Sequence, residues 1–194
     1  AVEVAPPGDG GGAASSSGGG GSSRARARDL QLSVLHGVTS AAEAAYARAI
    51  GVRPVINSLH QAEVWHAAGG GPCDLMVDTG INRLGVTPDA VDDPAIAALD
   101  VQVLLSHLAS ADEDVALNAR QLARFRDVAQ HVAHKALSLA NSAGIALGSD
   151  YAFDLTRPGL SLYGGIARPE LADVIRHLPE VLAALQYPIE IGRA

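Results

Sequence analysis

The sequence has one cysteine, one lysine and few aromatic side chains among its 194 residues. With Cys73 alone, neither an intrachain disulfide nor a multi-cysteine metal site can form. The 14 basic and 21 acidic residues leave a net charge of −7, so the chain lacks the basic surface that binds a nucleic-acid backbone. It has no apolar run of about 18 residues to cross a membrane and no secretory signal pattern. We therefore expect a cytoplasmic protein with no nucleic-acid or membrane partner.

Residues 1–28 differ in composition from the rest of the chain. They are mainly Gly, Ala, Ser and Pro and end in alternating Arg and Ala, so they cannot bury enough apolar surface to offset the entropy lost on folding. We expect a disordered low-complexity leader here. Lys135 is the one lysine among the 14 basic residues, a bias typical of a GC-rich coding sequence. Together with the abrupt change near Arg28, this bias favours the hypothesis of a reading frame truncated at both ends.

From residue 29 onward, short apolar runs alternate with stretches of helical character. Strands that are apolar on both faces and alternate with helices are typical of a parallel sheet covered by helices, an α/β fold. The choice lies between an open doubly wound sheet and a (β/α)8 barrel of the TIM type. A complete barrel needs about 250 residues, so we expect a partial (β/α)8 barrel with about six of its eight units. The predicted strands cover residues 32–35, 54–56, 74–77, 101–105, 136–139 and 160–163.

Capping boxes, in which a serine is followed three residues later by an acid or an amide, predict where helices begin. An apolar stripe with steps of three and four residues also predicts an amphipathic helix over residues 113–134. The three capping boxes pair Ser40 with Glu43, Ser58 with Gln61 and Ser110 with Glu113.

Polar segments follow the predicted strands at their carboxyl ends, where function collects in such folds. Residues 77–86 read Val-Asp-Thr-Gly-Ile-Asn-Arg-Leu-Gly-Val, and residues 106–113 read Ser-His-Leu-Ala-Ser-Ala-Asp-Glu. Residues 139–144 read Leu-Ala-Asn-Ser-Ala-Gly, and residues 153–164 read Phe-Asp-Leu-Thr-Arg-Pro-Gly-Leu-Ser-Leu-Tyr-Gly. In this order and spacing, and with Pro-Val-Ile-Asn-Ser before them, the segments resemble the alanine racemase family over residues 33–166.

The resemblance implies an N-terminal barrel that binds pyridoxal 5′-phosphate (PLP) and a C-terminal β-domain. It also implies interconversion of L- and D-alanine by a homodimer, an activity that supplies D-alanine for peptidoglycan. On this interpretation, residues 29–185 form the partial PLP-binding barrel and residues 186–194 are the truncated start of the β-domain.

Three residues of the matched segments correspond to family residues around the PLP ring. Arg157 would donate to the pyridine nitrogen, and His107 would lie beside the ring and hydrogen-bond to Arg157. Arg83 would lie near the phenolic oxygen of PLP and the substrate carboxylate. A guanidinium stays protonated and cannot hand its proton to the ring. The ring would therefore be a weak electron sink, and catalysis would depend more on protein bases.

Four further residues are implied to hold PLP through its phosphate. Asn141 and Ser142 follow the fifth predicted strand, and Gly159 and Leu160 follow the Arg-Pro pair. Free backbone N–H groups and a hydroxyl after a strand can hold a dianion. The missing side chain at Gly159 lets the backbone approach the phosphate closely.

One position inside the matched segments departs from the family pattern. Many members have a carbamylated lysine seven residues before the arginine equivalent to Arg83, and this chain has Met76 there. We therefore expect Arg83 to be oriented in another way, or less firmly.

The family's two catalytic bases have no counterpart in the sequence. The PLP-binding lysine ends the family's first barrel strand, and the second base is a tyrosine from the partner subunit's β-domain. Lys135 precedes the predicted strand that ends before Asn141, so about 16–20 Å separate it from the phosphate end. We assign no catalytic base and expect the isolated chain to be inactive. The alternative is a non-catalytic PLP-binding remnant or an interaction module.

Two other patterns suggest different chemistry. Asp78, Thr79 and Gly80 follow apolar residues, as in aspartic proteases, but those enzymes are nearly all strand whereas this chain alternates strands with helices. His131 and His134 lie three residues apart on a predicted helix. Because no third ligand is evident, a solvated helix face is favoured there over a metal site.

Overall fold

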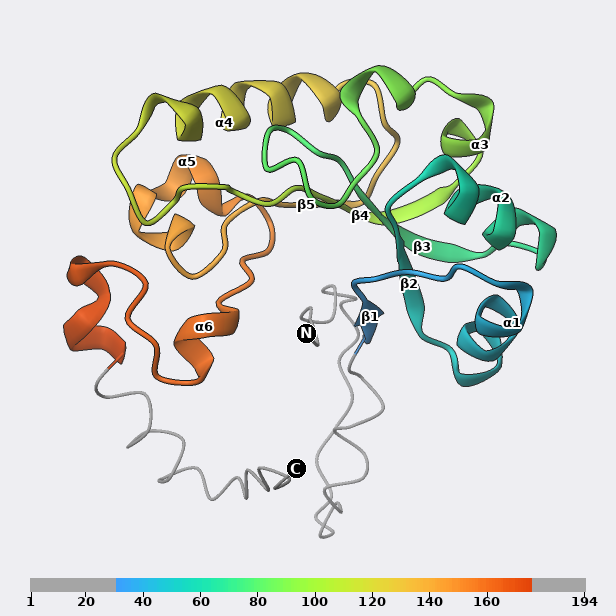
Figure 1. Cartoon of the computed structure of the whole chain (residues 1–194), viewed down its shortest axis with the longest axis horizontal. Coiled ribbons are helices and arrows are strands. Elements are labelled where there is room, and N and C mark those ends of the chain that lie inside the picture. The colour runs from blue at the N-terminus through green and yellow to red at the C-terminus, as the bar shows by residue number, and fades with distance from the viewer. Residues whose placement is uncertain (1–30, 176–194) are drawn as a thin grey trace, which may run out of the picture.

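Five parallel strands form one sheet in the computed structural model, which describes residues 31–175. They lie side by side in chain order, each strand parallel to the next (Figure 1). A doubly wound sheet reverses its strand order at a switch point, whereas a barrel adds each strand on the same side. The order is therefore that of a partial (β/α)8 barrel. The strands are β1 (Ser33–Val34), β2 (Arg53–Ile56), β3 (Pro72–Met76), β4 (Asp100–Leu105) and β5 (Ala136–Ser138).

Four helices cover one side of the curved sheet, as Figure 1 shows. They are α1 (Ala41–Ile50), α2 (Leu59–Ala67), α3 (Pro94–Ala97) and α4 (Ala116–Val128). Shorter helical turns occupy the connections after β3 and β5. These are η2 (Pro88–Ala90), η3 (Gly144–Leu147), α5 (Ser149–Ala152), α6 (Gly159–Leu162) and η4 (Pro169–Leu171). Within residues 31–175, no helix combines the length and hydropathy needed to cross a bilayer.

Both faces of the sheet are apolar, as the sequence predicted for strands of a parallel sheet. The larger core cluster lies between the strands and the helices and includes Trp65, Leu104 and Phe125. A smaller cluster on the other face, which we call the inner cluster, contains Val55, Met76, Val103 and Leu105. Residues of a strand alternate between faces, so strands packed on both sides are mostly apolar; the buried exceptions here are Ser33, Asp74 and Ser138.

Two of the three predicted capping boxes form N-caps. Ser40 Oγ accepts a hydrogen bond from Glu43 N at 3.3 Å, and Ser58 Oγ accepts one from Gln61 N at 3.2 Å. The glutamate carboxylate of the first box accepts from Thr39 N at 2.6 Å. These bonds satisfy N–H groups that the first turn of a helix leaves without partners.

The helix start predicted from the third capping box, Ser110 with Glu113, is wrong. Residues 110–114 form a turn instead of a helix, and α4 begins later, with Val115 at its N-cap and no side-chain cap. The nearly buried Arg168 accounts for this difference, because its guanidinium donates to Ala111 O at 2.9 Å and to Asp114 Oδ1 at 2.7 Å. The contact with Arg168 thus stabilises a turn at residues 110–114, where the local pattern favours a helix.

The sixth predicted strand, over residues 160–163, is also wrong, because that run forms the short helix α6. The preceding segment, residues 154–157, lies beside β5 instead. Asp154 N donates to Leu137 O at 3.1 Å, and Asn141 and Arg157 form an isolated parallel bridge. Pro158 has no N–H and cannot extend a ladder. The leucines that suggested a strand are more than half exposed on α6, Leu160 at 56% and Leu162 at 52%.

A fully buried carboxylate, that of Asp74, links four strands through side chains. Asp74 on β3 accepts from Ser33 Oγ on β1 at 2.5 Å and from Val103 N on β4 at 3.1 Å. The guanidinium of Arg53 on β2 lies 3.4 Å from the same carboxylate. Burial raises the pKa of Asp74 above its ordinary value, and the hydrogen bonds from Ser33 and Val103 and the charge of Arg53 offset only part of this rise. A buried charge is tolerated when it is paired and hydrogen-bonded, as here.

Replacement of Asp74 by leucine should destabilise the protein strongly. The change leaves the Arg53 charge without its carboxylate and Ser33 Oγ without an acceptor, at a cost of about 3 kcal/mol in the free energy of unfolding. Urea unfolding followed by circular dichroism measures this loss. Asp100→Ala, at an exposed position of β4, is the control and should change the free energy by less than about 0.5 kcal/mol. Equal losses in the two variants would contradict a structural role for the buried pair.

Candidate active site

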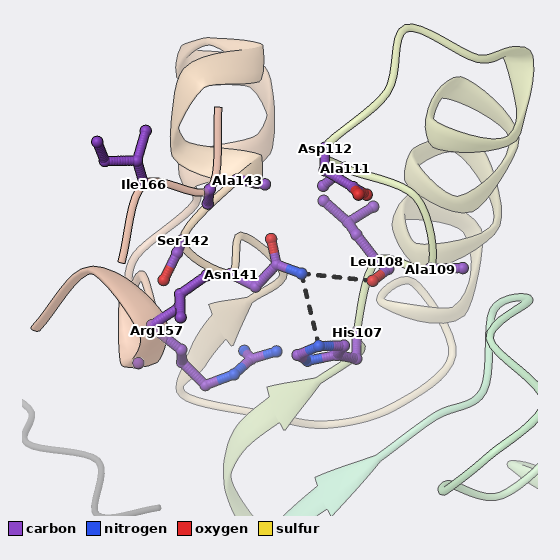
Figure 2. A pocket seen from close by; sticks show the side chains of 13 residues that line it. His107, Leu108, Ala109, Ala111, Asp112, Asn141, Ser142, Ala143, Arg157 and Ile166 are labelled. Atoms are coloured by element: carbon purple, nitrogen blue, oxygen red, sulfur yellow. Dashed lines mark hydrogen bonds between the residues drawn. The ribbon is translucent and has the colours of Figure 1, made fainter. Parts of the chain in front are cut away.

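A cavity of about 500 Å³ lies beyond the carboxyl ends of β4 and β5 (Figure 2). In parallel barrels these strand ends meet at one rim, where loops from different strands converge. The cavity walls come from the loop after β4, the loop after β5 and the segment that follows residue 157. Six of the seven predicted site residues line it: His107, Asn141, Ser142, Arg157, Gly159 and Leu160.

Arg157 is anchored by the two strand ends beside it. Its Nη1 donates to Ser138 Oγ, and its Nη2 donates to Ser106 O. Its backbone N donates to Ala140 O at 2.8 Å, which aligns the segment with the end of β5. Figure 2 shows the guanidinium pointing towards the His107 ring. The arginine charge therefore has a defined place at the cavity.

His107 is held neutral by its surroundings. Burial, together with the nearby charges of Arg157 and Arg83, lowers its pKa to about 4. Asn141 Nδ2 lies 3.5 Å from His107 Nε2 and 3.4 Å from Leu108 O. A neutral imidazole can accept a hydrogen bond at one ring nitrogen, which an imidazolium cannot do. The predicted direct bond between His107 and Arg157 stays a prediction.

The predicted phosphate end of the cavity has a pocket of small and polar residues. Ser142 Oγ accepts from Ser161 N at 3.1 Å, which ties the loop after β5 to the first turn of α6. A Cβ built on Gly159 would meet no atom within 4 Å, so the backbone is open to a ligand there. The Gly159 N–H itself donates to Arg157 O at 2.9 Å. The hydroxyl of Ser161 is buried and has no hydrogen-bond partner among residues 31–175.

Arg83 does not line the cavity. It is exposed, in a loop that Asp78 shapes by accepting from Gly80 N, Ile81 N and Asn82 N at 2.8, 2.9 and 3.1 Å. Its charge is still near enough to lower the pKa of His107. At the position where many family members have lysine, Met76 packs in the inner cluster and offers no charge to Arg83.

Lys135 lies at the opposite end of β5 from Asn141. Its Nζ donates to Gln102 Oε1 at 2.7 Å, near the start of β4.

The side chains of the aspartic-protease pattern and of the histidine pair make local hydrogen bonds. Asp78 serves as the acceptor of its own loop, and both His131 and His134 bond to backbone carbonyls. Among residues 31–175, no group of three potential metal ligands is present.

Three polar residues that were not predicted from the sequence form hydrogen bonds behind the cavity-lining residues. Ser106 and Ser138 are fully buried at the strand ends that bind Arg157, and Gln121 is fully buried on α4. A signal was available in the sequence. A serine inside or directly after an otherwise apolar predicted strand, and a glutamine on the apolar stripe of a helix, indicate buried hydrogen bonds, because buried polar groups are nearly always paired.

The family model for the alanine racemase N-terminal domain matches residues 21–167 of the chain. The chain belongs to the alanine racemase family. An alanine racemase from Rhizobium meliloti is 49% identical over 124 residues, which cover 59% of this chain and 33% of that protein. One from Methylobacterium nodulans is 40% identical over 175 residues, covering 84% of this chain and 46% of that protein.

Solved structures of alanine racemases share the fold. The enzyme from Bartonella henselae, crystallised with covalently bound PLP, is 33% identical with a TM-score of 0.65, over 72% of this chain and 42% of that one. The biosynthetic enzyme from Pseudomonas aeruginosa is 30% identical with a TM-score of 0.66, over 80% and 46% of the two chains. The chain thus spans less than half of the length of these relatives.

The low pKa of His107 predicts how stability depends on pH. The unfolded chain takes up a proton at this histidine near pH 6.5 and the folded chain near pH 4, so stability falls as the pH drops between these values. His107→Gln should flatten this slope by up to about 1.4 kcal/mol per pH unit. Urea unfolding at several pH values measures the slope. His131→Gln, at an exposed histidine, is the control that should keep the wild-type slope.

Proposed function

We propose that this chain is the cofactor-binding part of a PLP-dependent alanine racemase, which interconverts L- and D-alanine. The observation that carries the proposal is the cavity in which the anchored Arg157 guanidinium points towards a neutral His107, with Ser142 at the same rim. Membership of the alanine racemase family supports it. A cytoplasmic location, alanine as substrate and a homodimer in the complete enzyme are further parts of the proposal.

The residues present fit PLP in three respects. The cavity is large enough for a ligand of this size, since small-molecule sites commonly have about 300–1,000 Å³. Gly159 leaves its side of the cavity open, and the Ser142 hydroxyl lines the cavity on the loop after β5. Arg157 would hold the pyridine nitrogen, while Ser142 and the backbone N–H of Leu160 would hold the phosphate, next to Asn141 and to the open side of Gly159, whose own N–H donates to Arg157 O.

Arg157 and His107 would act by orientation and charge. When bound, PLP supplies a conjugated ring that accepts electron density from the α-carbon of an amino acid. Arg157 keeps its proton at any biological pH and therefore donates a hydrogen bond without transferring the proton. His107 is neutral near pH 7 and accepts hydrogen bonds without adding a second positive charge next to Arg157. Arg83 lies outside the cavity and would contribute its positive charge from there.

The alternative is a PLP-binding protein without turnover, or an interaction module. One specific observation favours it: Lys135, the one lysine of the sequence, lies at the far end of β5 from the cavity. Racemisation needs general bases on both faces of the α-carbon. Neither base is among the residues that line the cavity.

PLP should bind this chain saturably, and Ser142→Ala should weaken binding about tenfold or more, because a hydrogen bond to a charged phosphate is worth about 1.5–3 kcal/mol. Quenching of the single tryptophan by added PLP measures the dissociation constant. Ser149→Ala, an exposed serine on α5, is the matched control and should bind as the wild type does. After borohydride treatment, peptide mapping should find no pyridoxyl group on Lys135. Unchanged binding in Ser142→Ala would refute the phosphate assignment.

The 194-residue chain alone should not racemise alanine. With PLP added, formation of D-alanine from L-alanine should stay at the rate of free PLP, because neither a lysine nor a tyrosine, the family's two bases, is among the residues that line the cavity. Chiral chromatography of the product measures this rate. Turnover clearly above that of free PLP would show that a residue of this chain acts as a base and would overturn the assignment.

A further inference from the structure

Gln121, on the buried face of α4, bonds to the loop that carries His107. Its side chain is fully buried. Its Nε2 donates to His107 O at 2.9 Å, and its Oε1 accepts from Ala109 N at 2.9 Å. One amide thus holds the backbone on both sides of Leu108, immediately after β4. The bond to His107 O fixes the peptide group that follows His107, and the bond to Ala109 N fixes the next peptide group along the loop.

The same amide also reaches the loop after β3. Gln121 Nε2 lies 3.3 Å from Thr79 Oγ1, to which it donates, and Thr79 Oγ1 shares a hydrogen bond of 2.7 Å with Ser106 Oγ. Ser106 O in turn accepts from Arg157 Nη2. The described contacts therefore run without a break from α4, through the ends of β3 and β4, to the arginine at the cavity.

The hydrogen bonds of the Gln121 amide hold its side chain in one orientation against the loop. Both ends of the amide have partners; the Gln121 side chain is fully buried, and its two bonds to the loop are partly buried. An apolar side chain of similar size would fill the space but would leave His107 O and Ala109 N without partners, and buried groups of this kind relax towards other partners or water. A loss of the amide should therefore move the loop that carries His107.

We propose that Gln121 is a positioning residue that keeps the His107 ring beside Arg157 by holding the backbone of residues 107–109. Its functional meaning rests on the proposed function, because His107 would border the PLP ring. Asn118 provides a matched comparison on the same helix. It is also a buried amide, but its Nδ2 donates to Glu113 O at 2.8 Å, away from His107.

The test compares Gln121→Leu, Gln121→Glu and Asn118→Leu in the full chain. Gln121→Leu should weaken PLP binding about tenfold, which corresponds to the loss of about 1.4 kcal/mol. It should also shift the imidazole resonances of His107 in NMR spectra and speed amide exchange at Ala109. Gln121→Glu keeps an acceptor for Ala109 N but loses the donor to His107 O. It should therefore keep slow exchange at Ala109 and still shift the His107 resonances.

Asn118→Leu should lower the melting temperature but leave the PLP dissociation constant, the His107 resonances and Ala109 exchange as in the wild type. The proposal is overturned if Gln121→Leu and Asn118→Leu have the same effects on these three quantities. If Gln121→Leu does not fold, Gln121→Glu decides, and unchanged His107 resonances in that variant overturn the proposal. A wild type that binds no PLP while the His107 resonances respond as expected would refute the proposed function but support the positioning role.

Discussion

The guanidinium of Arg157 lies against the carboxyl ends of two neighbouring strands, where it donates to Ser138 Oγ and Ser106 O. A guanidinium has five donors, no acceptor and a permanent charge, so it needs acceptors fixed in place and tolerates no second cation nearby. The two strand ends supply the acceptors. Burial and the arginine charge together keep His107 neutral. The protonation state of His107 therefore depends in part on this one charge.

Parallel strands make such an arrangement possible because their carboxyl ends meet at one rim. The cost is that polar side chains are buried behind the site, and each needs a partner. Thr79, Ser106 and Gln121 meet this requirement by bonding to one another and to the backbone of the site loops. At the other end of the sheet, Asp74 and Arg53 form a separate buried pair. The buried polar side chains of this fold therefore either link neighbouring strands or form hydrogen bonds to the loops that line the cavity.

Local patterns failed where a distant side chain or a neighbouring segment decided the backbone conformation. The serine at 110 has the spacing of a capping box, but Arg168 binds the turn at Ala111 and Asp114 and delays the helix. The leucine-rich run after Pro158 has strand-like composition, yet residues 154–157 already occupy the edge of β5. Neither contact has a signature within the local sequence.

The sequence by itself determined the α/β class, the positions of the five strands to within a few residues, two helix caps and the segments that resemble alanine racemases. These features depend on local periodicity, capping chemistry and residue order, all of which can be observed within short stretches of the sequence. The tertiary structure alone decided that Arg83 stands outside the cavity, that Ser106 and Ser138 anchor Arg157, and that α6 replaces a strand. The physical reason is that partners of a buried polar group lie far apart in sequence, here 51 residues for Arg157 and Ser106, and only packing brings them together.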